Sequence, residues 1–471
     1  MLRWTSSSSR RVPLSSSTTE TPAVDFTPTA EALEAAIALL ARSAGNGGAI
    51  EAELRREALA RFAELPAPGA RPNRGWKYDY ANLAFEELRW TSDRRTVPTI
   101  PFATQSLAAA DPELDRPALQ TENAGGLVHL GATLLEAEDG ARGDARVVVL
   151  PLADAAAQPA LLGALNAIVE WRTDKFAALA TAFQNCGAFV YVPDGVQLDA
   201  PIQLVFANSE AQDDAVFPHV VVVIGKNARA TVIERHLGNG DPFVCGIVEA
   251  HAGEGAQLDY VVVQQAGEAA RMMFSRGARA ERDAQVRWHL AELGGALART
   301  VLDVRLEAPG SRAEASALFF NTGLQHVDLT SGVDHVVGPT TSDTVVRSAA
   351  TDRGQGRYTG NIVIRPKAHG SDASLRDDAL LLSKHAHIDS VPALEIAAND
   401  VKAFHGATIG SLDEDALFYA GTRGIARNAA LRMITLGFFE PVVARFPGEA
   451  LRDEVRTALD RKLDDATEID G

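Results

Sequence analysis

The 471-residue chain has few cysteines, lacks an excess of positive charge and contains no long apolar run. Its two cysteines, Cys186 and Cys245, can form neither a disulfide framework nor a CxxC metal site, so a reducing compartment is expected. The formal net charge of −17 argues against a nucleic-acid partner, because phosphate contacts need clustered lysine and arginine. No apolar stretch approaches the roughly 20 residues of a membrane helix, and no secretory signal is recognisable, which favours the cytoplasm and no membrane partner.

Several enzyme motifs are also missing. No GxxxxGK[ST] phosphate loop occurs, and Gly354-Gln355-Gly356 is not followed by a helical pattern, so this chain is not expected to bind or hydrolyse ATP. The GxSxG and HExxH motifs are absent as well, which removes two common routes to hydrolysis.

The N-terminal part of the chain divides into a tail and a helical region. Residues 1–24 are rich in serine and basic, with no acidic residue before Glu20, and are interpreted as a disordered tail. A plastid transit peptide is the alternative. Residues 25–95 are predicted to form a helical region, because Thr27 and Pro28 precede apolar residues at helical spacing. The aromatic segment 71–83 is expected to dock this region onto the rest.

From residue 125 to 410 the chain consists of short β-branched runs separated by small-residue turns, with a helical lead-in at 160–186. Four turns have their second residues at 228, 256, 284 and 311, and the successive differences are 28, 28 and 27. A steady period in short strands without intervening helices is typical of a β-solenoid. A β-sandwich is the competing fold. The even spacing favours a mainly β protein, a right-handed parallel β-helix flanked by helical regions.

Helical spacing returns at the C-terminus, so residues 411–471 are predicted to form a helical domain. Ser411 and Glu414 have the spacing of a capping box, which places the first helix start there. In the last helix, apolar residues lie on one side and charged residues on the other. This apolar stripe either packs on the solenoid or binds a partner.

One histidine, His405, lies where the strand region ends and the helical region begins. If residues 401–405 form a strand, His405 shares a face with Val401 and Ala403. Two interpretations stay open: an inward-facing histidine bonded to a backbone carbonyl, or a metal ligand. An imidazole suits iron and can also carry protons near neutral pH.

Other histidines and the cysteines are weaker candidates. His385 and His387 would project from one face if both lay on a strand, with Asp389 extending the row as a conceivable metal site. Such pairs are common on solvated faces. His326 and His335 lack ligand spacing and receive no role. Both cysteines are expected to be small core residues.

Several motifs together resemble the SufB/SufD family of iron–sulfur cluster assembly scaffolds, and its SufD branch in particular. The segment CGAFVYVPDGVQLDAPIQL at 186–204 resembles the start of the family's β-helix. The segments DVKAFHGAT at 400–408 and LFYAGTRG at 417–424 resemble its C-terminal motifs. The central Tyr358-Thr359-Gly360 turn, the paired strands at 378–382 and 392–396, and the aromatic element at 71–83 are similar too.

The resemblance implies a non-enzymatic scaffold that pairs with a SufB-like paralogue, a homodimer being the alternative, and docks a SufC-like ABC-type ATPase. The complex would build a nascent, transient iron–sulfur cluster at the paralogue interface, with reduced flavin associated in some members. His405 matches the family's interfacial histidine. The expected ATPase-binding residues, on the C-terminal helices, are Leu417, Phe418, Tyr419, Arg423, Leu431, Ile434 and Phe438.

One departure from the family pattern concerns a ligand. Many relatives place a cysteine two residues before the interfacial histidine, where this chain has Ala403. An imidazole is then the only good transition-metal ligand in this short segment. Any sulfur ligand must come from the partner or from sulfide, which fits an accessory role.

A carbohydrate-active β-helix enzyme is the alternative function. Glycoside cleavage needs two carboxylates about 5–9.5 Å apart. The candidates are Asp372, Asp377, Asp378 and Asp389. Solenoid enzymes of this kind are usually secreted, and no secretory signal is recognisable here.

Overall fold

The structure is a computed structural model that describes residues 23–43, 48–68, 80, 83, 85, 88–91, 123–138, 144, 146–156, 164–208 and 214–466. Residues 1–22 of the expected tail and residues 71–79 of the aromatic segment lie outside the described residues. The last two residues of the expected tail belong instead to strand β1 (Ala23–Asp25), which pairs antiparallel with β2 (Arg89–Thr91). Two segments about 65 residues apart are thereby joined.

The N-terminal region contains helices α1 (Ala30–Ser43) and α2 (Gly48–Glu64). The α1 helix begins after Thr29, whose hydroxyl accepts the Ala32 N–H at 3.3 Å, so the expected start at Thr27 was two residues early. Helix α6 (Lys175–Phe183) lies within the expected helical lead-in at 160–186, whose described residues before Lys175 form turns and bends, and it packs with this region in a shared apolar cluster. Trp90 donates its indole N–H to the Phe183 carbonyl at 2.7 Å.

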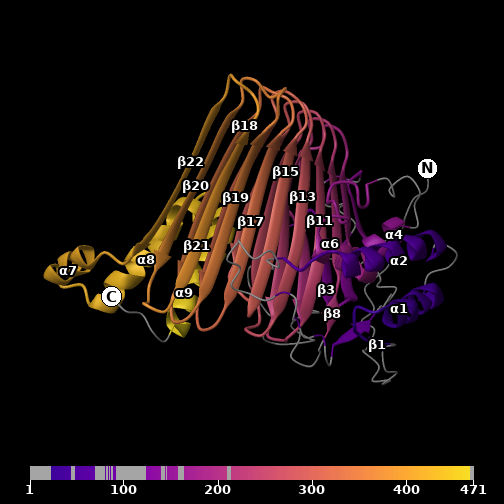
Figure 1. The fold of residues 1–471 in the computed structure, drawn as a ribbon, viewed down its shortest axis with the longest axis horizontal. Helices are drawn as coiled ribbons and strands as arrows, with labels where there is room; N and C mark the ends of the chain where they lie inside the picture. Colours follow the sequence, from indigo (N-terminus) through magenta and orange to yellow (C-terminus); the bar gives the residue numbers. More distant parts are fainter. Residues whose placement is uncertain are drawn as a thin grey trace, which may run out of the picture.

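The remaining strands form two sheets (Figure 1). Successive strands along the chain belong alternately to one sheet and to the other, so each turn of the coil adds one strand to each sheet. The first sheet contains, in spatial order, β4 (Thr133–Glu138), β3 (Gly125–Leu130), β7 (Ile202–Asn208), β10 (Arg229–Gly238), β12 (Gln257–Ala266), β14 (Gln285–Glu292), β16 (Arg312–Asn321), β18 (Thr341–Ala350), β20 (Asp372–Leu381) and β22 (Lys402–Ser411). The second contains β5 (Val148–Pro151), which follows into α4 (Leu152–Ala156), then β6 (Cys186–Val192), β9 (Pro218–Ile224), β11 (Phe243–Ala252), β13 (Arg271–Ala280), β15 (Leu297–Leu306), β17 (His326–His335), β19 (Gln355–Ile364) and β21 (His387–Ile396), with β8 (Ala215–Val216) beside β11. Apart from β4 and β5 these strands pair in parallel, which confirms a parallel β-solenoid, of about eight turns.

The period of 27 to 28 residues arises from stacked turns. Asn227, Gly255, Asp283 and Gly310 occupy one position in successive turns, and all have left-handed φ values of 52°, 67°, 57° and 81°. Glycine, asparagine and aspartate adopt this conformation most readily. Each turn bonds to the next: the Asn227 N–H donates to the Glu254 carbonyl and the Gly255 N–H to the Arg282 carbonyl, both at 2.8 Å. Each strand therefore begins in register with the strand one turn later.

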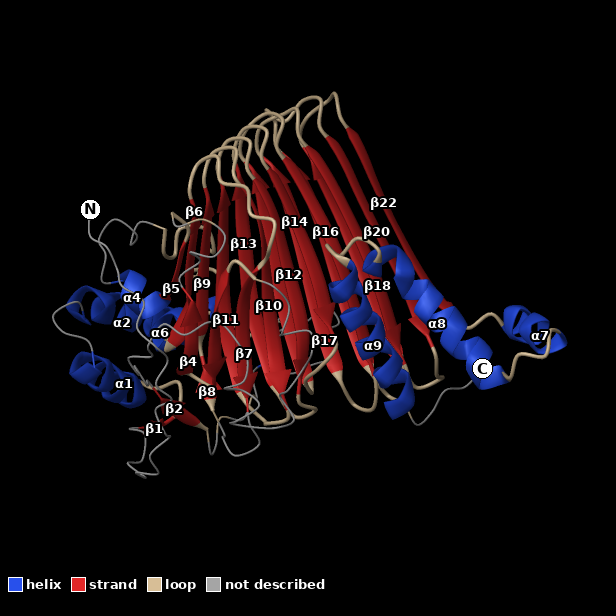
Figure 2. Cartoon of the chain, turned by 180° about the vertical axis from the view of Figure 1, so that it is seen from behind, coloured by secondary structure: helices blue, strands red, loops and turns tan. Residues whose placement is uncertain are grey.

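Helices α7 (Glu414–Thr422), α8 (Arg427–Val443) and α9 (Glu449–Asp465) follow the last strand. The α8 and α9 helices lie across the outer face of the first sheet, and α7 projects beyond the end of the solenoid (Figure 2). The predicted capping box was wrong, because β22 continues to Ser411 and Asp413 caps α7 by accepting the Asp415 and Ala416 N–H groups. Among the described residues, no helix is long and apolar enough to cross a membrane.

Candidate functional site

His405 is the last member of a row of side chains that point into the solenoid. Its register neighbour in β20 is Leu375, and the row continues one strand at a time through Thr344, Ala315, Trp288, Tyr260 and Val232. Each of those six side chains is at most 6% exposed. The prediction that His405 shares a face with Ala403 is confirmed, and this face is the inward one.

His405 is nevertheless exposed, because β22 is the last strand of its sheet in the described part of the chain. Within the described part of the chain, its imidazole has no hydrogen bond or ion pair, so the interpretation of a backbone-bonded core histidine is not supported. The ring is presented at the open end of the coil with its nitrogens free to meet a ligand from outside.

The open end is also an unpaired and apolar edge. Among the described strands, β22 pairs only with β20, and β21 only with β19, so each last strand leaves one row of backbone groups without a strand partner there. Four large apolar side chains on these strands are 41–55% exposed: Val391, Ile396, Phe404 and Ile409. Unpaired edges and exposed apolar side chains are features of surfaces that another chain covers.

The residues expected to bind an ATPase fall into two groups. Phe418 and Tyr419 on α7 are 75% and 59% exposed, and Arg423 is exposed beside Tyr419, with its guanidinium donating to the phenol oxygen at 2.9 Å. Leu417 and Leu431 are buried in the cluster that joins the helices to the first sheet. Ile434 and Phe438 are half-buried against the same cluster.

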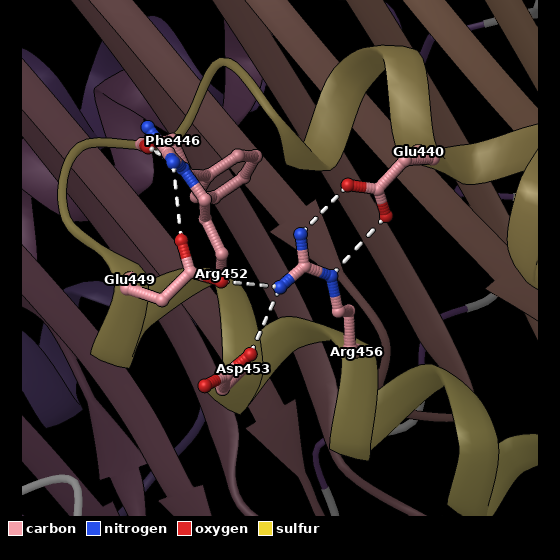
Figure 3. A network of polar contacts seen from close by, with 6 residues as sticks. All are labelled: Glu440, Phe446, Glu449, Arg452, Asp453 and Arg456. Atoms are coloured by element: carbon pink, nitrogen blue, oxygen red, sulfur yellow. Dashed lines mark hydrogen bonds and ion pairs between the residues drawn. The ribbon is translucent and has the colours of Figure 1, made fainter.

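Helices α8 and α9 are held together by a polar network on their outer side (Figure 3). Arg456 forms ion pairs with Glu440 at 2.7 Å, Glu449 at 2.8 Å and Asp453 at 2.9 Å. Arg452 donates to the Phe446 carbonyl at 2.8 Å, between the two helices. These contacts position the pair as one unit, from which α7 extends.

The other histidines do not make a site. His385 lies in the turn before β21, so the expected pairing with His387 on a strand was wrong. His387 instead bonds Asp389 at 2.8 Å. His335 is buried between the Thr340 and Ser342 hydroxyls, and burial lowers its pKa to about 4. Both of its ring nitrogens therefore have a hydroxyl partner inside the fold.

The chain provides no reactive thiol. Burial raises the pKa of Cys245 well above its ordinary value, and its thiol donates to the Phe176 carbonyl at 3.2 Å. Burial also raises the pKa of Cys186, with Asp214 adding to the effect. Among the described residues, no three histidine, cysteine or carboxylate side chains are grouped as a metal site.

The four aspartates considered for a carbohydrate-active enzyme do not lie together at one site either. Asp377 points into the solenoid and is fully buried, whereas Asp378 points outward and pairs with Arg347 at 2.9 Å. Asp372 is six residues from Asp378 along the same strand, roughly 20 Å away. Asp389 lies on the second sheet. Gly354-Gln355-Gly356 leads into strand β19, not into a helix, so the phosphate-loop interpretation has no structural support.

The fold and this end site define a parallel β-solenoid with helices at both ends and an exposed, partly apolar last turn. Sequence comparisons place it more closely. The family description "SUF system FeS cluster assembly, SufBD core domain" matches residues 206–438, and "SufBD protein N-terminal region" matches residues 133–204. The chain therefore belongs to the SufB/SufD family of iron–sulfur cluster assembly proteins.

Individual relatives are similar at modest identity. The iron–sulfur cluster assembly protein SufD of Bacillus subtilis (strain 168) is 28% identical over 293 residues, which cover 61% of this chain and 67% of the relative. SufB of the same organism is 26% identical over 280 residues, covering 59% and 60%. A SufBD family protein of Mycobacterium leprae (strain TN) is 27% identical over 265 residues, covering 56% of this chain and 30% of the relative. The chain thus spans between 30% and 67% of the length of these three relatives.

Proposed function

We propose that this chain is a SufD-like, non-catalytic scaffold subunit that pairs through its open solenoid end with a SufB-like paralogue. The carrying observation is the exposed His405 between two unpaired strand edges. A nascent iron–sulfur cluster is the cargo of this interface. The chain's own contribution is an imidazole nitrogen, which is a suitable ligand for iron. Sulfur ligands come from the partner or from sulfide, since Ala403 supplies none.

The apolar end surface supports pairing for a physical reason. Phe404, Ile409, Val391 and Ile396 lose contact with water when a second solenoid end stacks on the last turn, and the free backbone groups gain partners. A homodimer through the same surface is the competing assembly. Mass measurement of the isolated chain and of its mixture with the paralogue distinguishes the two.

The test of the cluster site is His405→Ala in the assembled complex. We expect the subunits to assemble normally and cluster formation to fall strongly, because the inward-facing imidazole of β22 is removed. His369→Ala is the matched control, since His369 is an exposed histidine in the turn before β20. If the His405→Ala complex matures a recipient ferredoxin at the wild-type rate, the proposed role of His405 is wrong.

We also propose that α7 docks a SufC-like ATPase through Phe418, Tyr419 and Arg423. These side chains are exposed on a helix that projects from the body, whereas Leu417 and Leu431 support it from within. A Phe418→Ala/Tyr419→Ala double variant should keep its fold and lose the ATPase in copurification. Leu324→Ala is the control, because Leu324 is 78% exposed at a distant turn. We assign reduced flavin no residues in this chain.

A further inference from the structure

A buried carboxyl group lies one turn inside the open end. Asp377 belongs to the inward row of β20, between Leu375 and Ala379, both of which are core residues. It is 0% exposed, and burial raises its pKa, whereas the nearby Ser390 hydroxyl lowers it. Buried charges in proteins are normally paired or bound to a metal ion, so a carboxyl group with a neutral hydroxyl beside it in an apolar row calls for an explanation.

Hydroxyl groups lie near this carboxyl group on the other sheet. Ser390 is on the inward side of β21, and its hydroxyl lowers the pKa of Asp377. Its register neighbour Tyr358 shares a hydrogen bond of 2.7 Å with the Ser331 hydroxyl. Burial raises the pKa of Tyr358, and Asp377 adds to the effect. These groups form a polar cluster at the end of an otherwise apolar interior.

His405 lies on the last turn, next to this polar cluster. It is the register neighbour of Leu375, and Ala407 is the register neighbour of Asp377, so both side chains project inward from adjacent strands, two positions apart. Strand spacing and rise place their Cα atoms roughly 8 Å apart. An ion about 2 Å from an imidazole nitrogen and from a carboxylate oxygen fits this separation, because both side chains reach several ångströms from the backbone.

Resting on the proposed function, we infer that Asp377 and His405 together bind the ferrous ion delivered to this subunit, with Ser390 orienting the carboxylate. On the side of the last strand, Asp377 is covered by its register neighbour Ala407, whose side chain is a single methyl group. An imidazole and a carboxylate are ligands that suit Fe²⁺. Water or partner groups complete the coordination, which agrees with the lack of any three-residue group among the described residues.

The test is an anaerobic titration of the full chain with Co²⁺ alone, followed by its visible absorption. We expect Asp377→Asn and Asp377→Ala each to weaken binding at least tenfold, and His405→Ala to do the same. Asp378→Asn is the matched control, because this neighbouring carboxylate points outward to Arg347 and should bind Co²⁺ like the wild type. Thermal unfolding of the two Asp377 variants checks that the fold is retained.

Wild-type Co²⁺ affinity in the folded Asp377→Asn protein would overturn the inference. If His405→Ala still abolishes cluster formation in the complex, the proposed function survives that result and only the role of Asp377 is wrong. The inference would also be overturned if Asp378→Asn weakened Co²⁺ binding as much as Asp377→Asn does. Loss of any negative charge in this region would then explain the weaker binding.

Discussion

Replacing Glu454 by alanine removes the ion pair that anchors helix α9 to the solenoid. The Arg235 guanidinium donates to both Glu454 oxygens, at 3.0 and 3.1 Å, and the two side chains are 2% and 9% exposed. Removing one partner of a buried pair typically costs about 3–5 kcal/mol, because the other charge is left buried. Gln203 still accepts a hydrogen bond from Arg235, so we expect the lower end, about 3 kcal/mol.

The expected loss is local, because a solenoid does not unfold as one cooperative unit. Native-state hydrogen exchange of α9 is therefore the assay, and about 3 kcal/mol corresponds to roughly hundredfold faster exchange. Asp453→Ala is the control: its pair with Arg456 is exposed and should contribute only about 0–1 kcal/mol. If Glu454→Ala accelerates exchange no more than Asp453→Ala, the buried pair does not anchor the helix.

Three further predictions concern the solenoid itself. Burial raises the pKa of Asp377 to about 6, so its ionisation destabilises the fold as pH rises through that value. In thermal unfolding, Asp377→Asn should be more stable than wild type at pH 7.5, by up to about 3 kcal/mol, and equal at pH 3; equal stability at both would contradict this. Gly238→Ala should lower the free energy of unfolding by about 4 kcal/mol, which is typical of a severe steric conflict in a core. The reason is that the new Cβ would lie 1.8 Å from a backbone oxygen. Gly195→Ala should lower the free energy of unfolding by only about 1 kcal/mol, because the new Cβ meets no neighbouring atom and the positive φ is the one unfavourable feature. Native protein at pH 8 should resist iodoacetamide at Cys186 and Cys245, and rapid labelling before unfolding would show that a thiol is accessible.

Much of the architecture could be predicted because its cause is local and repeated. Asn227, Gly255, Asp283 and Gly310 mark the turns by residue type, since few other residues tolerate a left-handed backbone. Stacking these turns forces a constant strand spacing, which is visible as the period. The helix start after Ser411 was misplaced by contrast, because Ser411 pairs in β22 with Leu381, a long-range contact that overrides the local capping pattern.

The candidate site could be predicted only in part. Strand alternation placed His405 on the face of Ala403, but the same alternation equally describes a buried histidine. Asp377 and Asp378 are adjacent and chemically identical, yet one is sealed inside and the other paired outside. Which of two neighbours points inward depends on the register with the next strand, and a shift of one residue reverses it.

The amino-acid sequence by itself determined the repeating coil, the helical ends and the lack of a reactive cysteine motif, because these depend on residue type and spacing along the chain. Only the tertiary structure decided that His405 is exposed, since that follows from the absence of another turn above β22. It alone also placed a buried carboxyl group on the strand next to that histidine, because the two residues are 28 positions apart and come close only through strand register.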